Sequence, residues 1–274
     1  MTTTLERPLA IAAAAAAEPH QGRRRPSRRW ITSWVSIAAL LTAWQLAPTL
    51  GWVDKTFLPP LSQVLHAWWN LAGSGQLWAD TSISLQRSLT GFGIAILFGV
   101  PLGLLIGWYP LAAELLNPLL TVFLNTAALA LLPVFTLILG IGETSKIAII
   151  VYASVWPILY NTISGVRNVD PLLIKSARSL GVGPVRLFQK VILPASAPTI
   201  FTGVRLSGAA SILVLITTEM VGAKAGLGYL IINSQFNFQI PQMYAGILTV
   251  SLVGVAFNAL LRGLERRFST WRVD

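Results

Sequence analysis

The sequence predicts an all-α polytopic membrane protein that crosses the bilayer six times and keeps both termini in the cytoplasm. Three observations support this fold class: the composition, a series of long apolar runs, and the placement of the basic residues. Hydrophobic residues make up 54% of the 274 residues and charged residues only 11%, which is far from the balance of a soluble domain. Several apolar runs approach or exceed the length needed to span a bilayer.

The basic residues predict the topology. The formal net charge is +10, and the Lys and Arg residues gather before the first apolar run, in one central loop, and after the last run. Such clusters mark the cytoplasmic segments of membrane proteins. We therefore expect both ends and the central loop in the cytoplasm, and we expect no nucleic-acid partner.

Six spans divide the chain. Residues 1–29 are rich in Ala, Arg and Pro and should form a disordered basic cytoplasmic tail. Residues 30–80 should hold the first span, over 30–50, and an external amphipathic segment. Residues 81–264 should form one transmembrane domain, and residues 265–274 a second cytoplasmic tail. Within that domain the spans are expected over residues 83–108, 115–140, 147–163, 200–222 and 243–261.

The external segment should contain a short surface helix. Ser62 is a candidate N-cap for it. Leu65, Trp68 and Trp69 would let this helix lie on the membrane surface.

Two spans carry stripes of small residues at helical spacing. The second span has four of them at strict four-residue spacing, and the fifth has three: Ala95, Gly99, Gly103 and Gly107, then Gly203, Ser207 and Ser211. Small residues let membrane helices approach closely. The first stripe predicts packing inside the bundle, and the alternative is a lipid-facing dimer seam.

Several chemistries are excluded or unsupported. The chain has no Cys, which rules out disulfides, zinc–thiolate sites and Cys nucleophiles. The two His residues, His20 and His66, lie far from any acidic cluster, so no metal site is expected. The order of residues in "GIGETSKI", with Glu143 and Lys146, does not match a phosphate-binding loop. We expect no catalytic residue and no bound cofactor on this chain.

The central loop, residues 164–198, contains the segment "KSARSLGVGPVRLFQKVILP". Pro184 and Pro194 divide it into short helical pieces, and Gly181 allows a sharp bend between them. This segment resembles the conserved cytoplasmic loop of ABC importer permeases, which reads Glu-Ala-Ala, three residues, Gly, nine residues, Ile-x-Leu-Pro. The matching positions are Lys175, Ser176, Ala177, Gly181, Val191, Leu193 and Pro194. Lys175, Ser176 and Val191 depart from the residue types of the pattern.

The resemblance runs from about residue 40 to the end of the chain. "FLPPLSQVL", "SLQRSLTGFGIAILFGVPLGLLIG", "LALLPVFTLILGIGETSKI", "GVRLSGAASILVLITTEMVGAKAGLGYLI" and "LERRFSTW" are similar to the permeases for sulfonates, taurine, nitrate and bicarbonate. Those permeases often carry Arg and Pro where this chain has Leu124 and Ala127. If that region lines the path, the substrate or its handling should differ from typical members.

The resemblance implies a type I importer permease of the bacterial inner membrane. Its partners would be a cytoplasmic ABC ATPase dimer that binds ATP and Mg, a second permease subunit that makes a homodimer, an external solute-binding protein, and membrane lipid. The central loop would dock on the ATPase through a flat face made by Ala177 and Gly181, with charge from Arg178, Arg186 and Lys190. The alternative is a basic loop that only contacts anionic headgroups.

Few charged residues lie in the predicted spans. Arg205 opens the fifth span and Glu219 closes it. They are fourteen residues apart, or about 21 Å along a helix, so they should not pair within it. Glu219 is either an interfacial carboxylate bonded to Lys224 or to backbone N–H groups, or a gate or scaffold group beside the path. Further candidates for the path are Leu124, Asn125, Thr126, Asn161 and Thr217. The polar ones could instead form interhelical hydrogen bonds.

The resemblance implies ATP-driven import of a small, mostly anionic solute such as a sulfonate, taurine, nitrate or bicarbonate, with aromatic acids also possible. The alternative is a secondary transporter or channel driven by an ion gradient, which should show inverted repeats and carboxylates at mid-membrane. A membrane-embedded enzyme would need a convergent set of catalytic side chains, which the sequence does not offer.

Overall fold

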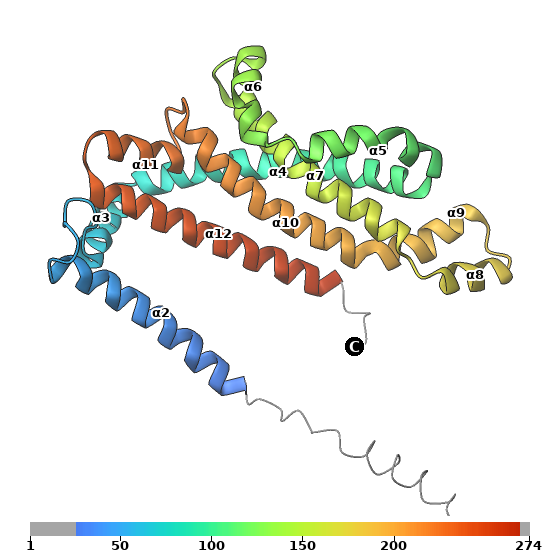
Figure 1. Cartoon of the computed structure of the whole chain (residues 1–274), viewed down its shortest axis with the longest axis horizontal. Coiled ribbons are helices and arrows are strands. Elements are labelled where there is room, and N and C mark those ends of the chain that lie inside the picture. The colour runs from blue at the N-terminus through green and yellow to red at the C-terminus, as the bar shows by residue number, and fades with distance from the viewer. Residues whose placement is uncertain (1–25, 269–274) are drawn as a thin grey trace, which may run out of the picture.

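The computed structural model describes residues 26–268, and within this range every regular element is helical. Four long helices lie side by side and form the bundle (Figure 1). They are α4 (Gln76–Trp108), α7 (Glu143–Arg167), α10 (Leu193–Met220) and α12 (Ile240–Phe268). Each is long and apolar enough to cross a membrane, and α10 does so as the end of a continuous helical stretch from Pro184.

A fifth candidate span is broken in the middle. α5 (Pro110–Leu124) is followed by a 3₁₀ turn (Ala128–Leu131) and α6 (Leu132–Leu139). The two halves are bent by 84°, and α6 projects from the bundle (Figure 1). The sequence predicts one span over 115–140 with polar and Pro interruptions, and the break falls directly after α5, at residues 125–127.

Helix α2 (Pro26–Thr49) leaves the bundle and touches it mainly through α3 (Figure 1). It begins inside the segment predicted as a tail, so residues 26–29 are helical. Likewise α12 continues to Phe268, into the predicted second tail. The rest of both tails, residues 1–25 and 269–274, lies outside the described residues. Among the described helices, α2 is not one of those that meet the length and apolarity criteria for a span.

The predicted surface helix exists as α3 (Leu61–Gly73), but the predicted cap is wrong. The N-cap is Pro60, without a side-chain hydrogen bond, because the helix starts one residue before Ser62. The Ser62 N–H donates instead to Gln45 Oε1 at 3.0 Å. Leu65 and Trp69 are exposed, as expected for a helix on a membrane surface.

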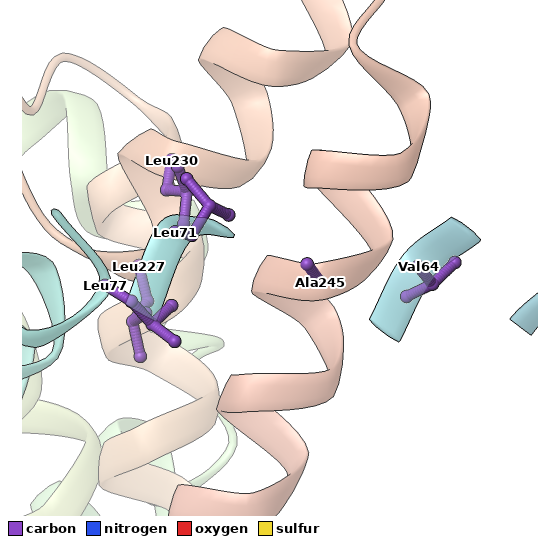
Figure 2. Packing of buried hydrophobic residues seen from close by; sticks show 6 residues of the cluster. All are labelled: Val64, Leu71, Leu77, Leu227, Leu230 and Ala245. Atoms are coloured by element: carbon purple, nitrogen blue, oxygen red, sulfur yellow. The ribbon is translucent and has the colours of Figure 1, made fainter. Parts of the chain in front are cut away.

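Trp68 does not share that exposure. Its indole N–H donates to Thr249 Oγ1 of α12 at 3.1 Å, and its ring packs on a cluster of buried apolar residues. This cluster joins α3, α4, α11 (Leu227–Phe236) and α12. Figure 2 shows its buried members, Val64, Leu71, Leu77, Leu227, Leu230 and Ala245. This cluster lies at one end of the bundle, and the central loop, residues 164–198, lies at the other end (Figure 1).

The small-residue stripe of α4 packs inside the bundle, as the first of the two alternatives predicts. A methyl group on Gly103 would lie 2.6 Å from Thr162 Cβ of α7, and one on Gly107 would lie 2.8 Å from Val166 Cβ. Gly99 faces Ile158 of α7 in the same way. These glycines allow α4 and α7 to approach closely along most of their length.

The stripe of α10 also faces neighbouring helices. Gly203 lies against Asn161 and the Pro157 carbonyl of α7. Ser207 Oγ donates to the Ser154 carbonyl of α7 at 2.6 Å. Ser211 Oγ lies 3.2 Å from Ser88 Oγ of α4. Helices α4, α7 and α10 therefore form one closely packed unit.

Candidate functional site

The central loop folds into two short helices joined by a turn. α8 (Pro171–Ser179) is capped by Asp170, whose Oδ1 accepts the N–H of Leu172 at 2.8 Å. The turn contains Gly181 at φ +73°, a conformation that favours glycine at helix ends. α9 (Pro184–Leu187) then runs through a π-helical turn (Phe188–Ile192) into α10. We call residues 171–192 the coupling loop, and the end of the bundle that carries it the loop end.

The coupling loop has its own small core. Ala177, Leu187 and Ile192 are buried in it together with Val166 and Val169 at the end of α7. In addition, the rings of Trp108 of α4 and Phe188 meet edge to face at 5.2 Å. The coupling loop is therefore packed as one body onto the ends of α4, α7 and α10.

This core changes the role of one predicted contact residue. Ala177 is buried inside the coupling loop, whereas Gly181 is exposed. Because α8 ends at Ser179, the two do not lie on one helical face, and the flat face expected from them is not formed. Val191 is half-buried, and Leu193 and Pro194 lie exposed in the first turn of α10.

The outer surface of the coupling loop is apolar with basic residues around it. Leu172, Leu180 and Val185 are 69%, 83% and 68% exposed. Four exposed residues of this segment are basic, Lys175, Arg178, Arg186 and Lys190, and three are neutral and polar, Ser176, Ser179 and Gln189. Apolar side chains surrounded by polar ones are typical of protein interfaces, so this surface is suited to a protein partner.

A group of charged side chains lies at the opposite end of the bundle, with Arg87 of α4 at its centre. Arg87 Nη1 donates to Glu219 Oε1 of α10 and to the Ala225 carbonyl, both at 2.7 Å. Its Nη2 donates to Glu143 Oε1 of α7 at 2.6 Å, and its Nε to the other oxygen of Glu143. We call Asp80, Ser84, Arg87, Glu143 and Glu219 the charged cluster.

Glu219 is completely buried within this cluster. Its carboxylate accepts hydrogen bonds from Arg87, from Ser84 Oγ at 2.8 and 2.9 Å, and from the Gly228 N–H at 2.9 Å. The sequence predicted that Glu219 bonds either to Lys224 or to backbone N–H groups. The structure confirms the backbone N–H group and shows no bond to Lys224 among the described residues. The side chain has no exposure, so the carboxylate is held entirely by groups of the protein.

The charged cluster also holds the segment after α10. The Gly226 N–H donates to Asp80 Oδ1 at 2.9 Å, and the Leu227 N–H donates to Ser84 Oγ at 2.8 Å. Gly226 has φ +118°, and a methyl group there would meet the Glu219 carboxylate. The cluster thereby joins α4, α7, α10 and the turn that leads to α11.

Of the charged cluster, only Glu219 was predicted from the sequence as a site residue, and Glu143 was considered only for a phosphate-binding loop. A signal for Asp80, Ser84 and Arg87 was present, because these positions are spaced by four and three residues and so share one helix face. Arg205, in contrast, behaves as expected and does not pair with Glu219. It lies 3.4 Å from Glu265 of α12 in a partly exposed ion pair.

The other predicted path residues are not brought together into one site. The four polar candidates are Asn125, Thr126, Asn161 and Thr217. Each side chain donates a hydrogen bond to the backbone carbonyl four residues earlier in the chain, so these bonds are not interhelical. Leu124 lines a cavity of about 270 Å³ between α4, α5 and α7. No group of three or more His, Cys, Asp or Glu that could hold a metal occurs in the part of the chain that the structure describes.

Comparison with known proteins now identifies the family. Residues 99–270 match the family model described as "binding-protein-dependent transport system inner membrane component". The chain belongs to this family. It is the permease component of an ABC importer, a multi-pass protein of the inner membrane.

Curated relatives of this permease match over nearly their whole length. The taurine transport system permease protein TauC of Escherichia coli (strain K12) is 32% identical, covering 90% of this chain and 92% of the relative. The putative aliphatic sulfonates transport permease protein SsuC of the same organism is 34% identical, with 90% and 95% covered. The nitrate import permease protein NrtB of Leptolyngbya laminosa is 31% identical, with 91% and 95% covered.

Solved structures confirm the fold. The permease matches a chain of the inward-facing MetNI methionine ABC transporter with a TM-score of 0.60 at 16% identity, covering 68% of this chain and 93% of that one. It matches a chain of an amino acid ABC transporter with histidines at a TM-score of 0.56 and 19% identity, with 72% and 96% covered. The fold is that of type I ABC importer permeases.

Proposed function

We propose that this chain is the membrane subunit of an ATP-driven importer for a small oxyanion. Two identical permease subunits would form the path, and an external solute-binding protein would deliver the solute. A cytoplasmic ATPase dimer would bind ATP and Mg, while this chain binds no cofactor and performs no catalysis. The taurine, sulfonate and nitrate relatives support this class of solute.

The geometry of the coupling loop is the observation that carries the proposal. Its exposed leucines and valine form an apolar knob with basic residues around it. Its own core attaches it to α4 and α7, and it continues directly into α10. A partner that moves the knob would therefore move these three helices together. Such rigid-body motion is a common way to switch between two states of a transporter. A loop that only contacted lipid headgroups would not need this internal core.

The proposal includes the topology. Docking on a cytoplasmic ATPase places the loop end in the cytoplasm and the charged cluster toward the outside. With α2 as a sixth crossing, in addition to the four long helices and the broken α5–α6 span, both termini lie in the cytoplasm. The charged cluster then acts as a scaffold beside the external end of the path, and Glu219 is not a group that contacts the solute.

Leu180→Asp tests the docking. Leu180 is 83% exposed, so the substitution should leave the thermal stability of the permease unchanged. In the complex it places an unpaired charge in an apolar contact, and a loss of about 2 kcal/mol of docking free energy lowers affinity about 30-fold. We expect solute-stimulated ATPase activity, measured in nanodiscs with the cognate ATPase and binding protein, to fall accordingly.

Leu180→Met is the matched control, because it keeps the apolar surface and should retain stimulation. Gly181→Asp is a less direct probe, since residue 181 has a positive φ and the substitution also strains the turn. Full stimulation in Leu180→Asp would show that the knob is not the docking surface. Uptake without any ATPase would instead support a transporter driven by an ion gradient.

A further inference from the structure

The cavity between α4, α5 and α7 lies toward the loop end of the bundle. Its lining includes Arg167, the last residue of α7, and Asn168, its C-cap; both are exposed and lie a few residues before the coupling loop. The lining divides by chemistry into an apolar wall and a polar rim. The wall includes Leu120, Leu124, Trp156 and Leu159, and the rim includes Asn117, Thr121, Ser164, Arg167 and Asn168.

The apolar wall is held in place by aromatic packing. Trp156 of α7 stacks on Phe123 of α5, with ring centroids 5.5 Å apart and planes 8° from parallel. The ring of Tyr152 meets Trp156 edge to face at 5.5 Å, and its hydroxyl donates to the Phe123 carbonyl at 3.0 Å. Because these contacts fix Trp156 before any solute arrives, a solute that packs on this wall needs little rearrangement of it.

The polar rim carries one positive charge and no negative charge. Among the side chains that the structure describes, no carboxylate forms an ion pair with Arg167. Glu114 and Asp170 are the acidic residues closest in sequence to the lining residues of α5 and α7. Neither lines the cavity, and Asp170 caps α8. The rim therefore favours an anion over a cation.

We propose that this cavity binds the transported solute, and that the solute is an organic oxyanion. Its charged head lies at Arg167, and its hydrocarbon part packs on Trp156 and Leu124. The inference rests on the proposed function and narrows its solute class, because an inorganic oxyanion such as nitrate has no hydrocarbon part to bury against the wall. The volume of about 270 Å³ lies just below the range of roughly 300–1,000 Å³ for pockets that bind drug-sized molecules, which indicates a small solute.

The absence of Cys in this chain permits a direct test. The complete chain with Thr121→Cys is placed in nanodiscs, and the rate of its modification by a thiol reagent is measured with pentane-1-sulfonate or with nitrate at equal ionic strength. Pentane-1-sulfonate should slow the reaction roughly tenfold at ten times its dissociation constant, and nitrate should not. Adding Arg167→Gln should remove the protection, whereas Arg262→Gln, an exposed Arg outside the cavity lining, should retain it.

A second comparison uses the charge of the reagent. A sulfonate-bearing reagent should react faster with Thr121→Cys than a quaternary-ammonium reagent does, and Arg167→Gln should abolish that preference. Asn237→Cys, at an exposed position outside the cavity lining, should show neither protection nor dependence on Arg167. This control separates effects in the cavity from effects of the reagents.

Equal protection by nitrate and pentane-1-sulfonate, or protection that persists in Arg167→Gln, would overturn the proposal. So would an absence of protection at saturating pentane-1-sulfonate. The proposed function fails separately, when Leu180→Asp leaves stimulation intact or uptake needs no ATPase. The cysteine experiment uses neither ATPase nor binding protein, so the two failures are distinguishable.

Discussion

Arg87→Met should destabilise the folded permease by about 3–5 kcal/mol, the usual effect of removing one partner of a buried ion pair. The side chain of Arg87 is 7% exposed and that of Glu219 is 0% exposed. Without the guanidinium, the Glu219 carboxylate keeps only Ser84 and the Gly228 N–H as donors. The Ala225 carbonyl and Glu143 lose their partner as well. Thermal unfolding of the purified protein in nanodiscs measures the effect.

Arg205→Met is the matched control. Arg205 also forms an ion pair between two helices, but its side chain is 36% exposed and its partner Glu265 is 22% exposed. Pairs of this kind contribute about 0–1 kcal/mol, so the unfolding temperature should change little. Similar shifts for Arg87→Met and Arg205→Met would contradict a stabilising role of the charged cluster.

The double variant Arg87→Met with Glu219→Gln separates the effect of the Arg87–Glu219 ion pair from the effect of losing each side chain. Glu219→Gln removes the buried carboxylate that Arg87→Met leaves without its cation, and the remaining Glu143 side chain is 60% exposed and can be solvated, so part of the lost stability should return. If the double variant is as unstable as the sum of the two single variants, the side chains act independently and the ion pair is not the cause.

Gly103→Leu should disrupt the contact between α4 and α7. Even a methyl group at this position would lie 2.6 Å from Thr162 Cβ and 3.1 Å from the Leu159 carbonyl. The helix backbone at residue 159 cannot move aside as a flexible side chain does. Overpacking of this kind costs typically about 1–3 kcal/mol and occasionally more. We expect a lower unfolding temperature and a smaller yield of monodisperse protein.

Gly93→Leu on the same helix is the control. Gly93 is exposed, and a methyl group there would have no atom within 4 Å. It should therefore be tolerated in a lipid-facing position. Equal loss of stability in Gly93→Leu and Gly103→Leu would point to an effect of leucine on the helix itself, not on its packing against α7.

These features suggest how motion passes through the permease. The charged cluster joins α4, α7 and α10 at one end, the glycine and serine stripes hold them along their length, and the coupling loop packs on their other ends. The broken α5–α6 segment and the separate α2 are the parts less tied to this unit. A displacement of the coupling loop would then reach the opposite end of the bundle as a movement of one body.

Much of the fold was predictable because it depends on local properties of the chain. The long apolar runs predicted α4, α7, α10 and α12, and small residues at four-residue spacing predicted close packing within the bundle. The spacing of Gly181 and the prolines predicted two short helices joined by a turn. Each of these signals lies within one helix or one loop, where periodicity and backbone preferences act directly.

The charged cluster shows why the rest was not predictable. Arg87 and Glu219 are separated by 132 positions in the sequence, and nothing local indicates that they meet. Because an unpaired charge in a bilayer is costly, each one must have a partner or water. The sequence alone did not show which partner. The same holds for Ala177, whose burial depends on residues contributed by the ends of α4 and α7 and by the π-helical turn before α10.

The sequence by itself determined that this protein is a helical membrane protein whose central loop forms two short helices, because apolar length, charge placement and the spacing of Gly and Pro are local signals. Its motifs added the resemblance to ABC importer permeases. Only the tertiary structure decided which side chains neutralise one another, that α2 stands apart, and that a cavity lined by Arg167 lies beside the loop end. These features arise from contacts between segments distant in the chain, and their geometry exists only after the helices have packed.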